Sequence, residues 1–171
     1  MENTGRHSIF IGAGANLGHP SYGSPHQTLE AAFRDLARRG VRVLRVSAWF
    51  KTAPVPISDQ PWYQNAVIEV ETELSANSLL ATLNDVELAF GRVRTVPNAP
   101  RVIDLDLLDF RGEIAAGGPG QATLPHPRLA SRAFVLRPLA DLAPQWCHPV
   151  TGEPIQALLK ALPADQVTER L

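Results

Sequence analysis

The sequence predicts an α+β fold in which strands and helices follow the order βαββαβ. Four short apolar runs have the length or the alternation typical of strands, and two longer segments place apolar residues at helical spacing. The chain has 171 residues, of which 44% are hydrophobic, so it is long enough to bury a core. Because no internal repeat or composition boundary divides it, we expect a single domain over residues 1–171.

The first three predicted elements precede a proline-rich loop. Residues 8–13 form an apolar run that ends in glycines, which indicates a first strand. Residues 28–39 place apolar side chains at helical spacing, and Gly40 ends this predicted helix. Residues 41–50 alternate apolar and polar side chains at their start and predict the second strand. The loop that follows contains three prolines between residues 54 and 61, which disfavour regular structure there.

The remaining elements complete the predicted order. Residues 66–72 indicate a third strand, and residues 75–90 a second helix with Ser75 as its N-cap. A fourth strand contains Asp104 and Asp106. This order is the ferredoxin-like plan, an antiparallel sheet with helices packed on it. Further helical or hairpin additions follow at the C-terminal end, with short helices expected over residues 133–142 and 155–162.

Charge and cysteine content exclude several classes of function. The chain has 16 Lys and Arg against 17 Asp and Glu, so it lacks the basic excess typical of nucleic-acid-binding proteins. Cys147 is the only cysteine, which excludes an intramolecular disulfide and a thiolate metal cluster. The polar start leads into an apolar run too short for a signal peptide or a membrane span. We therefore expect a cytoplasmic protein with no membrane association.

Two acidic residues interrupt the apolar run of the fourth strand. Asp104 and Asp106 point to the same face, with Cα atoms about 6.6 Å apart, because side chains alternate along a strand. Two like charges in one small volume repel unless a cation neutralises them, and carboxylate oxygens without nearby Cys or His favour Mg²⁺. The alternative is a solvent-exposed face of an edge strand, with Leu105 and Leu107 turned to the core.

Basic residues and glycines near these acids suggest further site elements. Arg101 precedes the acidic strand, and Arg92 and Arg94 lie just upstream, so acids and arginines together indicate a phosphate-binding site. The segment 12–18 resembles a dinucleotide-binding turn, but its glycines miss the G-x-G-x-x-G spacing by one residue. We interpret it as a tight structural turn.

Five sequence blocks, in the same order, resemble a known enzyme family. They are IGAGANLG (11–18), QPWYQNA (60–66), GRVR (91–94), PRVIDLDLL (100–108), and PHPR (125–128) followed by RAFVL (132–136). The chain is similar, from residue 9 to about residue 149, to 6-hydroxymethyl-7,8-dihydropterin pyrophosphokinase of folate biosynthesis. That family has the ferredoxin-like plan and transfers the terminal diphosphate of ATP to the pterin's hydroxymethyl oxygen, releasing AMP.

The resemblance implies a set of site residues. Asp104 and Asp106 would hold two Mg²⁺ ions, and they would form the catalytic centre with Arg92 and Arg94, which lie in a loop that closes over the phosphates. The implied ATP contacts are Arg92, Arg94, Arg101, His126 and Arg132. The implied pterin contacts are Thr52, Pro54, Val55, Tyr63, Asn65 and Phe134. The expected partners are the two small-molecule substrates, ATP and the pterin, and the protein is expected to be a monomer.

Without the resemblance, other interpretations of these residues stay open. The arginines could be solvated surface residues, Phe134 ordinary helix core, and Asn65 a cap at a strand edge. Two other functions compete with the pyrophosphokinase. One is a non-catalytic ferredoxin-like module that binds a small regulator, and the other is a metal-dependent phosphohydrolase or nucleotidyl enzyme that uses the same acid pair.

Overall fold

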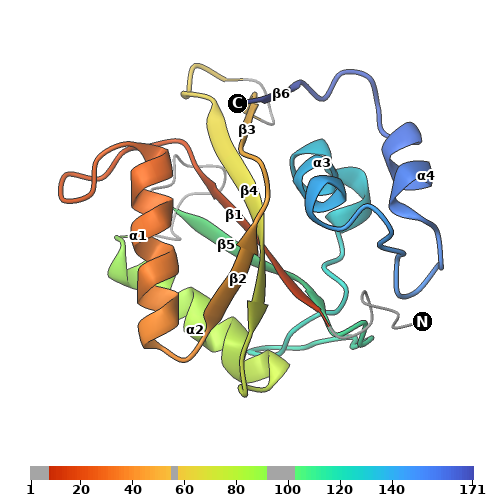
Figure 1. Ribbon diagram of the computed structural model, residues 1–171, viewed down its shortest axis with the longest axis horizontal. Coiled ribbons are helices and arrows are strands. Elements are labelled where there is room, and N and C mark those ends of the chain that lie inside the picture. Colours follow the sequence, from red (N-terminus) through yellow and green to blue (C-terminus); the bar gives the residue numbers. More distant parts are fainter. Residues whose placement is uncertain (1–7, 55–57, 92–102) are drawn as a thin grey trace.

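The computed structural model describes residues 8–54, 58–91 and 103–171 (Figure 1). In these residues six strands form one antiparallel sheet with the order β5-β1-β4-β3-β6, and β2 pairs with β4 beside β3. The strands are β1 (Ile9–Ala15), β2 (Arg42–Val46), β3 (Phe50–Thr52), β4 (Tyr63–Glu71), β5 (Asp104–Phe110) and β6 (Thr168–Arg170). With β2 and β3 as one interrupted strand, the predicted βαββαβ order is confirmed.

The second predicted strand, over residues 41–50, is wrong as a single strand. It is interrupted at Ser47, whose Oγ accepts the Val67 N–H at 2.9 Å. The next residue, Ala48, donates its N–H to Asp141 Oδ2 at 2.8 Å. Because these two hydrogen bonds do not follow regular strand pairing, they separate β2 from β3. The two strands then pair with different halves of β4. Strand β6 at the sheet edge was not predicted.

Both predicted helices of the core plan are present. Helix α1 (Pro25–Arg38) begins three residues before the predicted start because Ser24 caps it, forming reciprocal hydrogen bonds with Gln27. Helix α2 (Ala76–Ala89) begins after Ser75, whose Oγ accepts the Ser78 N–H, as predicted. The C-terminal additions are α3 (Ala133–Leu142) and α4 (Ile155–Lys160), preceded by a short 3-10 turn over Leu129–Ser131.

The helices cover both faces of the sheet (Figure 1). Helices α1 and α2 pack on one face, where alternate residues of β1 such as Ile9 and Ile11 enter the larger apolar cluster. Helices α3 and α4 pack on the other face around Phe10, Val67 and Leu108. Helix α3 leaves part of this second face open beside the start of β5, and the candidate site lies there.

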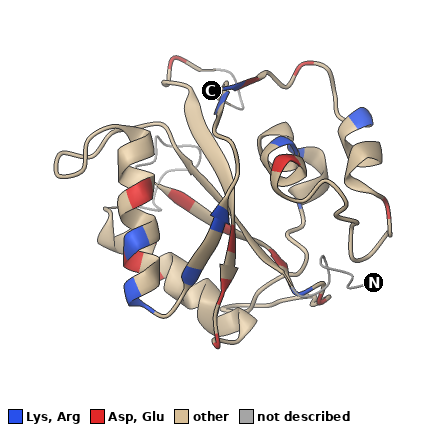
Figure 2. Cartoon of the chain, viewed as in Figure 1, with Lys and Arg blue, Asp and Glu red and all other residues tan. Residues whose placement is uncertain are grey.

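The described helices include none long and apolar enough to cross a membrane. Acidic and basic residues are dispersed over both helices and strands rather than gathered on one element (Figure 2).

A buried carboxylate joins β5 to the C-terminal segment. Asp109 is 1% exposed, accepts Trp146 Nε1–H on Oδ2 at 2.8 Å, and accepts the Gly112 N–H on Oδ1 at 2.9 Å. Burial raises the pKa of Asp109 above its ordinary value of 3.8, while the hydrogen bonds from Trp146 and Gly112, and then the charge of His148, act in the opposite direction. The Trp146 hydrogen bond therefore stabilises the ionised form inside the protein.

Replacing Trp146 by phenylalanine is expected to destabilise the protein more at pH 8 than at pH 5. The raised pKa of Asp109 means that stability falls as pH rises through that pKa, and loss of a stabilising donor raises the pKa further. Above that pKa, a buried carboxylate that has lost the donor to one of its two oxygens costs on the order of 1–3 kcal/mol, whereas below it the protonated group costs less. Urea unfolding at both pH values measures the difference.

The matched control for this prediction is Trp49→Phe. Trp49 is partly buried and stacks on His26 with ring centroids 4.1 Å apart. Its substitution removes packing without changing the hydrogen bonds of Asp109. Equal losses of unfolding free energy at the two pH values in Trp146→Phe would contradict the role assigned to this hydrogen bond.

Candidate active site

Two glycines of β1 form the floor of a cavity on the face opposite α1 and α2. Gly14 lies opposite Asp104 of β5 and opposite Asn65 of β4, while Gly12 lies opposite Asp106. Residues directly opposite one another on neighbouring strands share a face, so an acid, a glycine and an amide form one row across the sheet. Because glycine has no side chain, space remains between the acid and the amide.

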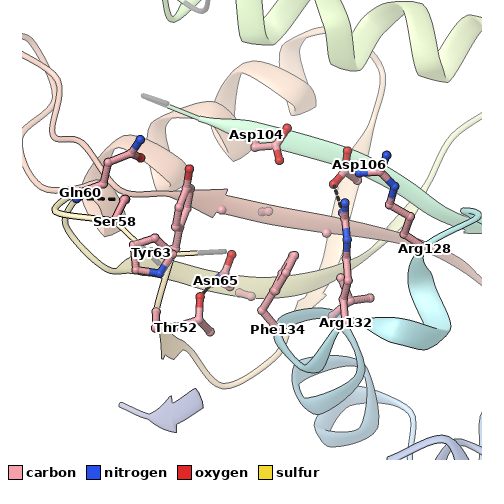
Figure 3. Close-up of a pocket in the computed structure, with 17 residues that line it drawn as sticks. Thr52, Ser58, Gln60, Tyr63, Asn65, Asp104, Asp106, Arg128, Arg132 and Phe134 are labelled. Atoms are coloured by element: carbon pink, nitrogen blue, oxygen red, sulfur yellow. Dashed lines mark hydrogen bonds and ion pairs between the residues drawn. The ribbon is translucent and has the colours of Figure 1, made fainter. Parts of the chain in front are cut away.

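The cavity has a volume of about 220 Å³. Figure 3 shows Tyr63 and Phe134 projecting from β4 and α3 towards the strand that carries Asp104. The residues that line it are Gly12, Ala13, Gly14, Thr52, Ala53, Pro54, Ser58, Gln60, Tyr63, Asn65, Ala66, Asp104, Asp106, Arg128, Arg132, Phe134 and Val135. It therefore combines aromatic and apolar walls with a few polar groups, as small-molecule sites commonly do.

The amide of Asn65 is held in one orientation. Its Nδ2–H donates to Thr52 Oγ1 at 2.6 Å, and both side chains are buried. A Cβ added to Gly14 would lie 2.4 Å from Asn65 Oδ1, so glycine is required where the amide lies against β1. Asn65 lies inside β4, and its interpretation as a cap at a strand edge is wrong. Phe134 lines the cavity and also packs against the apolar cluster around Val67 and Leu108.

The acid pair lies on the cavity side of β5. Asp104 and Asp106 are half-buried, and Leu105 and Leu107 are buried on the opposite face. The alternative prediction, an edge strand with its leucines in the core, describes β5 correctly. Its acidic face, however, is the wall of a cavity, where Arg132 Nη1 lies 4.0 Å from Asp106 Oδ2 (Figure 3).

Glu87 of α2 forms a hydrogen bond to β5 at the strand edge that faces away from β1. It is 1% exposed near the end of α2, and its Oε2 accepts the Leu105 N–H at 3.0 Å. Since β5 is at the edge of the sheet, this amide points away from β1 and is satisfied by the carboxylate instead. Glu87 thus fixes the backbone between the two acids.

A second cavity, of about 430 Å³, lies against the outer edge of β5. Its lining comprises Leu80, Asn84, Asp104, Leu105, Asp106, Leu107, Ala122, Thr123, His126, Pro127, Arg128 and Arg132. Four of these residues, the two acids and the two arginines, also line the first cavity. The acid pair therefore lies where the two cavities meet.

His126 presents a neutral ring to the second cavity. Burial lowers its pKa below the ordinary value of 6.5, the charges of Arg132 and Arg128 lower it further, and Asp104 acts in the opposite direction. Its Nδ1 accepts the Arg128 backbone N–H at 3.1 Å. In the neutral ring the proton is consequently on Nε2, which can act as a hydrogen-bond donor.

The structure brings most predicted site residues together. Thr52, Pro54, Tyr63, Asn65, Asp104, Asp106, Arg132 and Phe134 line the first cavity, and His126 lines the second. Val55, Arg92, Arg94 and Arg101 lie outside the described residues, as does most of the predicted phosphate-closing loop. The assignment of specific roles to all of these residues stays a prediction.

A further sequence interpretation is wrong, and several lining residues were missed. The glycines at 12 and 14 are not in a tight turn but in β1, which continues to Ala15. Gly and Ala alternate in this strand, which places both glycines on one face. This alternation was the sequence signal that the two glycines line a site. Arg128 stood in the Pro-His-Pro-Arg block without a role. Gln60 stood in the QPWYQNA block without a role, and Ser58, in an irregular loop outside the quoted blocks, had no comparable signal.

A family model described as 7,8-dihydro-6-hydroxymethylpterin-pyrophosphokinase (HPPK) matches residues 10–144. The chain belongs to this family. Its pyrophosphokinase relatives include two bacterial proteins named 2-amino-4-hydroxy-6-hydroxymethyldihydropteridine pyrophosphokinase. The one from Methylorubrum extorquens is 37% identical over 90% of this chain and 92% of the relative. The one from Pseudomonas aeruginosa is 37% identical over 95% of this chain and 96% of the relative. The predicted resemblance is confirmed.

Other relatives are much longer than this chain. Folic acid synthesis protein fol1 of Schizosaccharomyces pombe is 34% identical over 97% of the chain, which spans only 22% of that relative. Among solved structures, Plasmodium falciparum HPPK-DHPS A437G with STZ-DHP has a TM-score of 0.68 at 12% identity, covering 93% of this chain and 46% of that one. This likeness confirms the predicted fold.

Proposed function

We propose that the chain transfers a diphosphate group from ATP to the hydroxymethyl oxygen of 6-hydroxymethyl-7,8-dihydropterin and releases AMP. The observation that supports this most strongly is the meeting of two cavities at Asp104 and Asp106. A reaction between two substrates needs two adjoining sites with the reacting atoms at their junction. Membership of the pyrophosphokinase family identifies the substrates that we assign to them.

The first cavity suits the pterin. A flat heterocycle with a polar edge requires aromatic or apolar groups at its faces and amide or hydroxyl groups at its edge. Tyr63 and Phe134 would contact the faces, and Asn65, fixed by its hydrogen bond to Thr52, would bind the edge. Pro54 contributes to the wall, and we assign Val55 to the same site on the family resemblance.

The second cavity suits the triphosphate. Arg128 and Arg132 line it beside the acids, and the neutral ring of His126 adds a donor. Guanidinium groups bind phosphate through paired, charge-assisted hydrogen bonds. We assign Arg92, Arg94 and Arg101 to the same triphosphate on the family resemblance.

The acid pair suits Mg²⁺. The described residues contain no cluster of three or more His, Cys, Asp or Glu side chains, so Asp104 and Asp106 would supply only carboxylate oxygens. This fits Mg²⁺, which is commonly bound by one or two carboxylates together with phosphate oxygens and water. Two such ions would neutralise phosphate charge and align the reacting groups.

In the proposed reaction the hydroxymethyl oxygen attacks the β-phosphorus of ATP. The bond between that phosphorus and the oxygen that bridges to the α-phosphate breaks, and AMP leaves with this oxygen. Asp106, at the junction, is the acceptor that we assign to the hydroxyl proton. Arg128 and Arg132 stabilise the charge that develops on the phosphate oxygens.

Product analysis tests the proposed function. Incubation with ATP, Mg²⁺ and the pterin is expected to yield AMP and the diphosphorylated pterin in equal amounts. Formation of ADP or free phosphate would instead support a phosphohydrolase or another kinase. Binding without turnover would support the regulator-binding module. The expected monomeric state, cytoplasmic location and lack of nucleic-acid binding stay predictions from the sequence.

Arg128→Ala is expected to raise the KM for ATP by about tenfold or more, since a charge-assisted hydrogen bond contributes roughly 1.5–3 kcal/mol. Arg128 is exposed but lines both cavities beside the acids. Steady-state kinetics with ATP as the varied substrate measures the effect. The control is Arg137→Ala, because Arg137 is exposed on α3 outside the described lining of both cavities. Equal KM values for the two variants would remove Arg128 from the ATP site.

A further inference from the structure

A glutamine near the C-terminal end holds the turn that precedes α3. Gln166 Oε1 accepts the Ala133 N–H at 2.8 Å, and Gln166 Nε2–H donates to the Ser131 carbonyl at 2.8 Å. The two bonded backbone groups flank Arg132. A single side chain, more than thirty residues away in sequence, therefore fixes the backbone on both sides of this arginine.

The start of α3 requires such a partner. The first N–H groups of a helix have no acceptor within the helix, and a residue at the N-cap commonly provides one. Here the N-cap residue is Arg132, whose side chain makes no capping hydrogen bond. Gln166 provides this acceptor from outside the helix, so that the guanidinium of Arg132 stays near Asp106 and over the ring of Phe134.

Residues 167 and 168, which follow Gln166, also support the wall of the first cavity that contains Thr52 and Ala53. The Ala53 N–H donates to the Val167 carbonyl at 3.3 Å, and Thr168 of β6 pairs with Thr52 of β3. Thr52 in turn accepts the hydrogen bond from Asn65. Residues 166–168 thus contact both the strand that orients the amide and the turn that positions Arg132 and Phe134.

We propose that Gln166 is a positioning residue, which orders the start of α3 so that Phe134 and Arg132 face the two substrates. This proposal rests on the proposed function for the identity of those substrates. Gln166 lies beyond residues 10–144, the part of the chain that the family model matches. It contacts backbone groups rather than the cavity itself, so its effect on binding passes through the conformation of the turn.

The test compares Gln166→Met, of similar length but without hydrogen-bonding groups, with wild type. Hydrogen–deuterium exchange in the ligand-free protein is expected to become faster in a peptide containing residues 131–135. Calorimetry is expected to show about fivefold to tenfold weaker pterin binding, the range for loss of one or two hydrogen bonds. Gln156→Met, an exposed glutamine on α4, is the control and should change neither measurement.

A double substitution separates positioning from general stability. Phe134→Ala removes the side chain through which Gln166 is proposed to act on the pterin. Adding Gln166→Met to it should then change pterin affinity by less than about twofold. Equal fold losses with and without Phe134 would overturn the proposal, as would unchanged exchange in Gln166→Met.

The conservative variant Gln166→Glu distinguishes loss of the hydrogen bond to Ala133 from misfolding of the protein. Gln166→Glu keeps an acceptor for the Ala133 N–H, where negative charge near a helix N-terminus is favourable, but loses the donor to the Ser131 carbonyl. It should therefore weaken pterin binding less than Gln166→Met does, and an equal loss in the two variants would overturn the proposed role of the bond to Ala133. If the wild-type protein binds no pterin, the proposed function fails, while the exchange measurement still decides whether Gln166 orders the turn.

Discussion

Asp104→Asn and Asp106→Asn are each expected to lower turnover by at least about a thousandfold while the protein remains folded. Asparagine keeps the size of the side chain but removes the charge that would bind Mg²⁺ and balance the triphosphate. Loss of electrostatic stabilisation of the transition state commonly costs two to three orders of magnitude per group, and metal ligands contribute more. Quantifying AMP and diphosphorylated pterin under saturating substrates measures the loss.

Stability measurements distinguish this loss from misfolding. Both acids are half-buried at the junction of the cavities, so their neutral analogues should shift the melting temperature by only a few degrees. Asp35→Asn is the matched control, since Asp35 of α1 is also partly buried and forms a surface ion pair with Arg39, on the other face of the sheet. Turnover within a few-fold of wild type in either site variant would refute the assignment of the acid pair.

The sequence predicted the order of the core elements because each depends on local signals. Alternation, helical spacing and a capping serine are properties of neighbouring residues. The break between β2 and β3 depends instead on Ser47 and Ala48 bonding to Val67 and Asp141, which are distant in sequence. Strand β6 is three residues long and forms only against β3, so it has no independent periodicity.

The candidate site also contains some residues that local sequence predicts and others that only contacts between distant segments place. Asp104 and Asp106 were predictable because acids in an apolar strand are costly without a function. The roles of Gly12 and Gly14 depend on register, since pairing with β5 places them opposite Asp106 and Asp104, and pairing with β4 places Gly14 opposite Asn65. The contact between Gln166 and the start of α3 joins segments that no local pattern connects.

Gly14→Ala is expected to weaken pterin binding by at least about tenfold and to lower the melting temperature by several degrees. The added Cβ would lie 2.4 Å from Asn65 Oδ1, closer than such atoms approach in proteins, so the amide must move. Such movement would break or lengthen the buried hydrogen bond to Thr52. Leaving these buried groups unsatisfied costs on the order of 1–3 kcal/mol. The movement also turns the amide away from the edge of the proposed substrate.

Two comparisons make this steric explanation testable. In Gly12→Ala the new Cβ would lie 3.5 Å from Leu108 Cδ1, an ordinary contact, so a much smaller loss of stability is expected on the same strand and face. In an Asn65→Ala background the clashing oxygen is absent, and Gly14→Ala should then cost little further stability. Thermal melts of the four variants, with pterin titrations of the single ones, measure both effects. Equal destabilisation by Gly12→Ala and Gly14→Ala would mean that backbone freedom, rather than the placement of Asn65, requires glycine at position 14.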